Sequence, residues 1–100
     1  MATYIAGPMT GYPQYNYPAF AYVATALRAQ NVDVRSPHEI DNEGVDRPWE
    51  WYMRRAIQMM LDCDEVVLLP GWRDSRGARI EHQLAEHLGL PIREWAGSHD

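Results

Sequence analysis

The sequence predicts a small α/β domain in which helices cover both faces of a parallel sheet. Short apolar runs typical of strands alternate with amphipathic segments along the chain. The connections between them are short, as in βαβ units with right-handed crossovers. The apolar run from Val66 to Leu69 is unbroken, which is typical of a central parallel strand. We therefore expect a three-layer, Rossmann-like or flavodoxin-like sandwich with strand order 2-1-3-4.

The first half of the chain is expected to contain two strands and one helix. The first strand, Thr3 to Ala6, ends in a turn-rich segment of glycines and prolines at 7–13. Asn16 is a candidate N-cap for the first helix, which has Pro18 in its first turn. The apolar stripe of this helix consists of Phe20, Val23, Ala24 and Leu27. The second strand is expected at Val32 to Arg35.

The second half is expected to begin with a long connection. Ser36 to Pro48 is acidic and lacks periodicity, which indicates an exposed loop or, alternatively, a mobile lid. The second helix should run from Trp49 to about Asp62, because apolar residues recur three and four positions apart. The remaining elements are a third strand at Glu65 to Leu69, a third helix at Ala78 to Leu88 and a fourth strand at Ile92 to Glu94.

Length and composition restrict the class of protein. One hundred residues with 46% hydrophobic content indicate a single domain, residues 1–100. The formal net charge of −5 argues against duplex nucleic acid as a partner. No apolar run approaches the roughly 20 residues that span a bilayer, so we expect no membrane association. With no signal peptide expected and one cysteine, Cys63, a cytoplasmic location is predicted, the host cytoplasm if the chain is phage-encoded.

The types of basic residue and histidine spacing exclude several kinds of site. All nine basic residues are arginine, so phosphate would be bound by arginine or backbone amides and no Schiff-base lysine exists. The four histidines lack partners at metal-ligand spacing, and we assign no metal. The segment Gly7 to Gly11 lacks dinucleotide-fingerprint spacing, so neither NAD nor another cofactor is expected.

The segment from Ser75 to Glu81 is the strongest candidate for a binding site. It follows the buried strand and opens the third helix, where first-turn N–H groups lack intrahelical partners and the helix dipole favours an anion. Glu81 would lie one turn inside the helix, close to a bound ligand. A simple N-cap at Ser75 with a surface glutamate is the alternative.

Three parts of the sequence resemble a known superfamily. They are Tyr4 to Gly11, Cys63 to Trp72, and Ser75 to Glu81 followed by Ala85, Gly89 and Pro91. Together they resemble the nucleoside 2-deoxyribosyltransferase-like superfamily over nearly the whole chain, and most closely the DUF4406 group of small phage and bacterial proteins. The Ser-x-Gly-x-x-x-Glu spacing resembles the branch of nucleoside 5′-monophosphate N-glycosidases. The resemblance implies hydrolysis or transfer at the N-glycosidic bond of a nucleoside or its 5′-monophosphate.

The resemblance also implies roles for individual residues. Glu81 would be the nucleophile, since a carboxylate stabilises the positive charge that develops at the anomeric carbon. Tyr4 would donate a hydrogen bond that orients it; taken alone, a tyrosine in a strand is also explained by packing, which is the alternative. Asp74 is the acidic residue of the site loop. Arg76 or Arg79 would add charge beside a phosphate. The expected substrate-binding residues are Gly7, Met9, Thr10, Gly11, Gly71, Trp72, Ser75, Gly77 and Ala78.

Two positions depart from the pattern of these relatives. Ala56 stands where related glycosidases carry an aspartate that protonates the leaving base or activates water, help typically worth 10²–10⁴-fold. Gln83 stands where transferases often have glycine. A catalytically impaired protein that sequesters a nucleotide or signal molecule therefore remains the alternative to an enzyme.

The second helix also predicts self-association. Its methionines and tryptophans offer more apolar surface than one side of a small sheet covers. These residues are Trp49, Trp51, Met53, Met59 and Met60. We expect a homodimer or larger oligomer, and the resemblance agrees.

Overall fold

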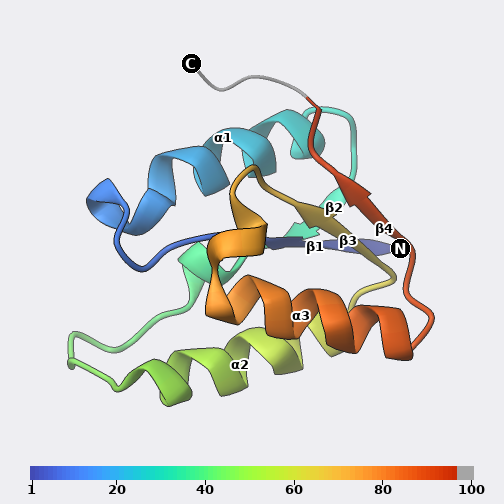
Figure 1. Cartoon of the computed structure of the whole chain (residues 1–100). Helices are drawn as coiled ribbons and strands as arrows, with labels where there is room; N and C mark the ends of the chain where they lie inside the picture. Colours follow the sequence, from blue (N-terminus) through green and yellow to red (C-terminus); the bar gives the residue numbers. More distant parts are fainter. Residues whose placement is uncertain (97–100) are drawn as a thin grey trace.

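The computed structural model describes residues 1–96 and contains one four-stranded parallel sheet (Figure 1). The strands are β1 (Ala2–Ala6), β2 (Asp33–Arg35), β3 (Glu65–Leu68) and β4 (Ile92–Glu94). Their order in the sheet is β2-β1-β3-β4, and every neighbouring pair is parallel. The predicted fold class and strand order are confirmed.

Helices cover the two faces of the sheet unequally. Helix α1 (Tyr17–Arg28) lies on one face, and α2 (Trp49–Leu61) and α3 (Arg76–His87) lie together on the other (Figure 1). Three single-turn 3₁₀ helices occur in the connections: η1 (Pro13–Asn16), η2 (Pro37–Glu39) and η3 (Trp72–Asp74). The three-layer arrangement follows from the apolar stripe of each helix, which must be buried against the sheet.

Alternation along β1 and β3 divides the core into two clusters. Ile5 of β1 and Val67 of β3 pack with the stripe of α1. Tyr4 and Val66 lie on the opposite face, in the cluster that includes Met60 of α2 and Ala85 of α3. All five residues of β1 are buried, as expected for a strand between two helical layers.

Two helix starts differ from the predictions. Asn16 has a left-handed backbone (φ 62°) and makes no side-chain cap of α1; its Nδ2 donates instead to the carbonyl of Pro8 at 2.9 Å. Helix α3 begins at Arg76 rather than Ala78, because Ser75 is the N-cap and its Oγ accepts the N–H of Ala78 at 3.2 Å. The N-cap assigned to Ser75 as the simpler alternative is therefore present.

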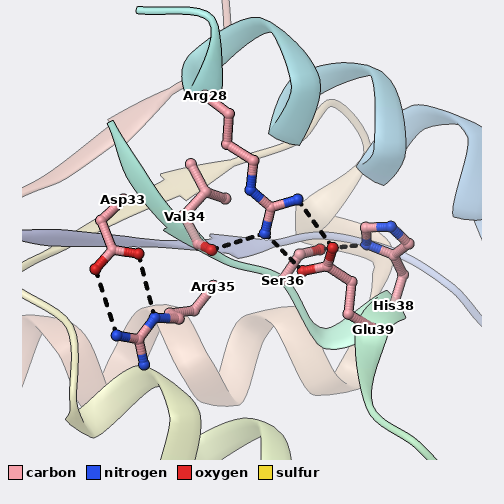
Figure 2. A network of polar contacts seen from close by, with 7 residues as sticks. All are labelled: Arg28, Asp33, Val34, Arg35, Ser36, His38 and Glu39. Atoms are coloured by element: carbon pink, nitrogen blue, oxygen red, sulfur yellow. Dashed lines mark hydrogen bonds and ion pairs between the residues drawn. The ribbon is translucent and has the colours of Figure 1, made fainter. Parts of the chain in front are cut away.

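The start of the 36–48 loop is attached to α1 and β2 by a polar network (Figure 2). The Arg28 guanidinium donates to both carboxylate oxygens of Glu39, at 2.8 and 2.9 Å, and to the carbonyl of Val34 at 2.8 Å. The hydrogen bonding of its carboxylate by Arg28 lowers the pKa of Glu39. Ser36, which is fully buried, hydrogen-bonds through Oγ to Nδ1 of His38. These contacts position the part of the loop that continues toward α2.

Candidate active site

A cavity of about 1080 Å³ opens beyond the carboxyl ends of β1 and β3. Residues that follow β1 form one side, and residues 74–78, from the end of η3 to the first turn of α3, form another. The 36–48 loop and the start of α2 complete the wall. Loops that diverge at a change in strand order make such a crevice the usual ligand site of an open α/β sheet.

A buried acidic pair lines this cavity. The hydroxyl of Tyr4, from β1, donates a hydrogen bond to Oε2 of Glu81, from the second turn of α3. Tyr4 is fully buried and Glu81 is 4% exposed. Burying a carboxylate to this extent is costly unless it is hydrogen-bonded. The Tyr4 hydroxyl replaces part of the hydrogen bonding with water that the carboxylate loses.

Burial changes the acidity of both members of the pair. It raises the pKa of Glu81 from 4.5 to about 7, and the hydrogen bond from Tyr4 opposes this rise. The pKa of Tyr4 is raised well above its usual value by burial and then by the nearby charge of Glu81. Perturbed carboxyl groups in clefts are candidates for catalytic function. Glu81 therefore ionises near neutral pH rather than well below it.

The N-terminal turn of α3 faces the same cavity. Ser75, Arg76, Gly77 and Ala78 all line it. The hydroxyl of Ser75 is engaged with Ala78, and the N–H groups of the first helical residues have no acceptor within the helix. A side chain at Gly77 would meet the sulfur of Met53 at 3.2 Å, so glycine allows α3 to lie close to α2. This turn can receive an anion.

The structure brings most of the predicted site residues together. Lining the cavity are Tyr4, Gly7, Met9, Thr10, Asp74, Ser75, Gly77, Ala78 and Glu81. Gly7 also packs closely against the next loop, since a Cβ there would lie 2.8 Å from Cβ of Leu69. The glycine therefore permits the loops after β1 and β3 to approach.

Three predicted residues do not line the cavity. Gly11 and Gly71 occupy left-handed backbone positions (φ 87° and 86°), so they shape turns at its edge. Trp72 is buried and stacks on His82, with ring centroids 4.4 Å apart. It lines a second, smaller hollow instead, together with Arg79 and with Gln83, which stands where related transferases often have glycine.

Several cavity residues were not predicted from the sequence. Tyr12, Tyr15 and Tyr17 line it from η1 and its flanks, where Gln14, Tyr15 and Asn16 have consecutive left-handed conformations. The recurrence of tyrosine in this turn-rich segment was the one feature of the sequence that could have indicated these cavity residues.

Tyr52 of α2 also lines the cavity. Its hydroxyl accepts a hydrogen bond from Nδ2 of Asn42 at 2.9 Å. Asn42, Asp46 and Arg47 line the cavity from the 36–48 loop, for which the sequence indicated an exposed connection or, alternatively, a mobile lid.

The two positions relevant to acid–base chemistry both lie in the cavity wall. Ala56 is 6% exposed and lines the cavity from α2. Asp74 lines it from η3 and is exposed. Within residues 1–96, no cluster of three or more histidine, cysteine or acidic side chains is placed to bind a metal ion. No helix in this part of the chain combines the length and apolar character needed to cross a bilayer.

A family model described as "Domain of unknown function (DUF4406)" matches residues 1–94. The chain belongs to this family. A search of curated proteins found no match for it.

Solved structures share the fold of this DUF4406 chain. A 2-deoxyribosyltransferase from Bacillus psychrosaccharolyticus matches with a TM-score of 0.73 and 20% identity, over 94% of this chain and 71% of that one. A conserved protein from Enterococcus faecalis V583 matches with 0.74 and 22%, over 94% and 62%. A 2-desoxiribosyltransferase from Leishmania mexicana matches with 0.71 and 18%, over 94% and 63%. At these identities the likeness concerns the fold.

Proposed function

We propose that this protein cleaves the N-glycosidic bond of a nucleoside or nucleoside 5′-monophosphate and passes the sugar to water or to a second base, with Glu81 as the nucleophile. The observation that carries the proposal is the buried Tyr4–Glu81 pair in the wall of a cavity large enough for a nucleotide. The fold shared with proteins named 2-deoxyribosyltransferases supports the same class of reaction.

The chemistry requires an ionised and oriented carboxylate. The base–sugar bond breaks as positive charge develops at the anomeric carbon, and the Glu81 carboxylate attacks that carbon to give a glycosyl-enzyme. The hydrogen bond from Tyr4 stabilises the ionised form and fixes its direction. Water then releases the sugar in hydrolysis, or a second base releases it in transfer.

A phosphate on the sugar would bind at the start of α3. The backbone N–H groups of Arg76 and Gly77, the dipole of α3 and the guanidinium of Arg76 all favour an anion there. The leaving base needs a proton, and Asp74 is the candidate donor, because Ala56 has no titratable group.

The experiment measures base release from a panel of nucleosides and their 5′-monophosphates by chromatography. The parent should release base, and Glu81→Ala should abolish release while retaining nucleotide binding, because the amides of α3 do not depend on that side chain. Equal release by the parent and Glu81→Ala would contradict the mechanism. Circular dichroism serves as the folding control.

Ala56 favours a second candidate, a nucleotide-binding protein without turnover. In that case the parent, Glu81→Ala and Ala56→Asp proteins would all bind nucleotide and none would release base. Because Ala56 lines the cavity, a carboxylate introduced there could reach the ligand. Increased base release by Ala56→Asp would favour the enzyme.

A further inference from the structure

Arg47 is a cationic residue of the cavity wall that the proposed chemistry does not use. It precedes α2 in the 36–48 loop and is half-buried. Its Nε atom is buried and has no hydrogen-bond partner within residues 1–96. A buried donor without an acceptor is destabilising, and such groups in native proteins call for an explanation. Because Arg47 lines the cavity, its other N–H donors, on Nη1 and Nη2, can bind an anion that enters it.

Stacking holds two guanidinium groups at the start of α2. That of Arg47 lies 4.8 Å from the ring centroid of Trp51, and that of Arg76 lies 4.2 Å from the centroid of Trp49. Both tryptophans belong to the first turn of α2. A guanidinium stacked on a ring keeps its N–H donors in its own plane, where they remain available to a phosphate.

Neither of these two arginines has a carboxylate within salt-bridge distance in the described part of the chain. The salt bridges within residues 1–96 engage Arg28, Arg35, Arg73 and Arg93. Asp46 and Asp74 line the same cavity but bond to neither arginine. A ligand with more than one negative charge would complement this arrangement.

The helix start beside Arg47 is also uncapped. The N-cap of α2 is Pro48, which offers no side-chain hydrogen bond, whereas Ser75 caps α3. The 13-residue helix α2 therefore presents first-turn N–H groups and the positive end of its dipole without a side-chain acceptor.

We propose that Arg47 and the N-terminal turn of α2 form a second anion subsite, which binds a second phosphoryl group of the nucleotide. The first phosphate would lie at the start of α3, so the favoured ligand is a nucleoside 5′-diphosphate rather than a monophosphate. The nucleotide part of this inference rests on the proposed function, but the paired anion sites do not.

The experiment compares affinities by calorimetry for dAMP, dADP and 2′-deoxyadenosine 3′,5′-bisphosphate, and for inorganic phosphate and pyrophosphate. In the parent, dADP should bind at least about tenfold more tightly than dAMP, as expected for one charge-assisted hydrogen bond. Pyrophosphate should likewise bind more tightly than inorganic phosphate. Preference for the 3′,5′-bisphosphate over dADP would overturn the 5′-diphosphate assignment.

Variants locate the second subsite. Arg47→Gln should reduce the dADP-to-dAMP affinity ratio to about one, and Arg47→Lys, which keeps the charge without the planar fork, should give an intermediate ratio. Arg54→Gln is the matched control, because Arg54 is exposed on α2 and does not line the cavity. Melting curves verify that each variant folds.

Two results would overturn the inference. One is a parent ratio of about one for both dADP over dAMP and pyrophosphate over phosphate. The other is a ratio unchanged in folded Arg47→Gln. Neither depends on base release, so failure of the proposed glycosidase activity leaves this test intact, and a pyrophosphate preference lost in Arg47→Gln would support the subsite by itself.

Discussion

Glu81 combines burial, a single strong hydrogen-bond donor and a position in the cavity wall. In water its carboxyl group would be ionised at neutral pH, but burial raises its pKa to about 7. The same environment that makes ionisation costly makes the ionised group reactive, because fewer water molecules compete with a substrate for it. Both consequences can be measured.

Base release should increase with pH through the pKa of Glu81. The nucleophile is the ionised form, so the rate should be low near pH 5 and rise toward pH 8, with the midpoint of the rise near pH 7. Tyr4→Phe removes the hydrogen bond that lowers this pKa, and should move the midpoint upward and slow the reaction. A pH-independent rate between these limits would contradict the assignment.

Stability should change with pH in the opposite direction. The pKa of Glu81 in the folded protein, about 7, lies above the ordinary value of 4.5 that applies to the unfolded chain. Between these pH values the folded state therefore retains a proton that the unfolded state loses. Stability is therefore full below about pH 4.5 and falls as pH rises from there through about 7, by about 3–4 kcal/mol in total, since each pKa unit corresponds to about 1.4 kcal/mol.

Glu81→Gln removes this dependence while keeping an acceptor for Tyr4. Chemical denaturation should show the variant to be more stable than the parent near pH 8 and similar near pH 4. Equal stabilities of parent and variant near pH 8 would show that Glu81 is more solvated than its burial indicates.

At the scale of elements, the start of α3 has two roles that one substitution can separate. Ser75 caps the helix, and the same turn is the proposed phosphate site. Ser75→Ala should cost about 1 kcal/mol of stability and weaken phosphate binding. Ser75→Asp should preserve stability, since aspartate caps equally well, but weaken phosphate binding further by repulsion.

Thermal melting and calorimetry with inorganic phosphate check this separation. The two measurements should rank the parent, Ser75→Ala and Ser75→Asp proteins differently. Phosphate binding that follows stability in all three would mean that Ser75 acts only as a cap.

The loops after β1 and β3 depend on a close contact. A methyl group at Gly7 would lie 2.8 Å from Cβ of Leu69, a distance that requires a shift of backbone. Gly7→Ala should therefore destabilise the fold by about 1–3 kcal/mol. Leu69→Ala should relieve only part of this loss, because it removes Cγ and Cδ1, at 3.0 and 3.1 Å, but retains Cβ at 2.8 Å. Leu69→Gly in the Gly7→Ala background should recover part of the loss attributable to the contact.

Denaturant unfolding of the four proteins in this cycle gives the interaction energy. The single variant Leu69→Gly measures the cost of truncating a buried leucine by itself. Additive losses in the double variant would show that the Gly7 contact is not the cause of the destabilisation.

For the whole molecule, the homodimer stays a prediction, and the structure leaves less apolar surface on α2 to support it than the sequence suggested. Met60 is fully buried in the core, Met53 lines the cavity, and the rings of Trp49 and Trp51 are contacted by arginines. Less of α2 is thus left for an interface than its sequence suggests. Leu61, at its end, is 51% exposed.

Light scattering at micromolar concentration should give a mass of at least twice the 11.5 kDa of the chain. If α2 forms the interface, Leu61→Asp should lower that mass, because an interface core disfavours a charged side chain. A monomeric parent would exclude the predicted homodimer.

The sequence by itself determined the class of fold, because its evidence is local. The apolar run of β3, the helical spacing along α1 and α2, and the turn residues between them restrict the topology to a few arrangements. It also indicated Glu81 and the Ser75 turn, which lie in one short segment after a buried strand.

Which side chains meet, and how they ionise, depends on how the helices and strands pack. Tyr4 and Glu81 are 77 positions apart, and their pairing and the raised pKa arise from burial between a strand and a helix. The sequence placed Trp72 beside the ligand, but its side chain points to the other hollow, where it stacks on His82. It gave no indication that Arg47 reaches the cavity, since a loop without periodicity carries no signal of where its side chains lie. Spacing along the chain determines the faces of helices and strands, whereas a site assembled from several loops depends on how those elements pack.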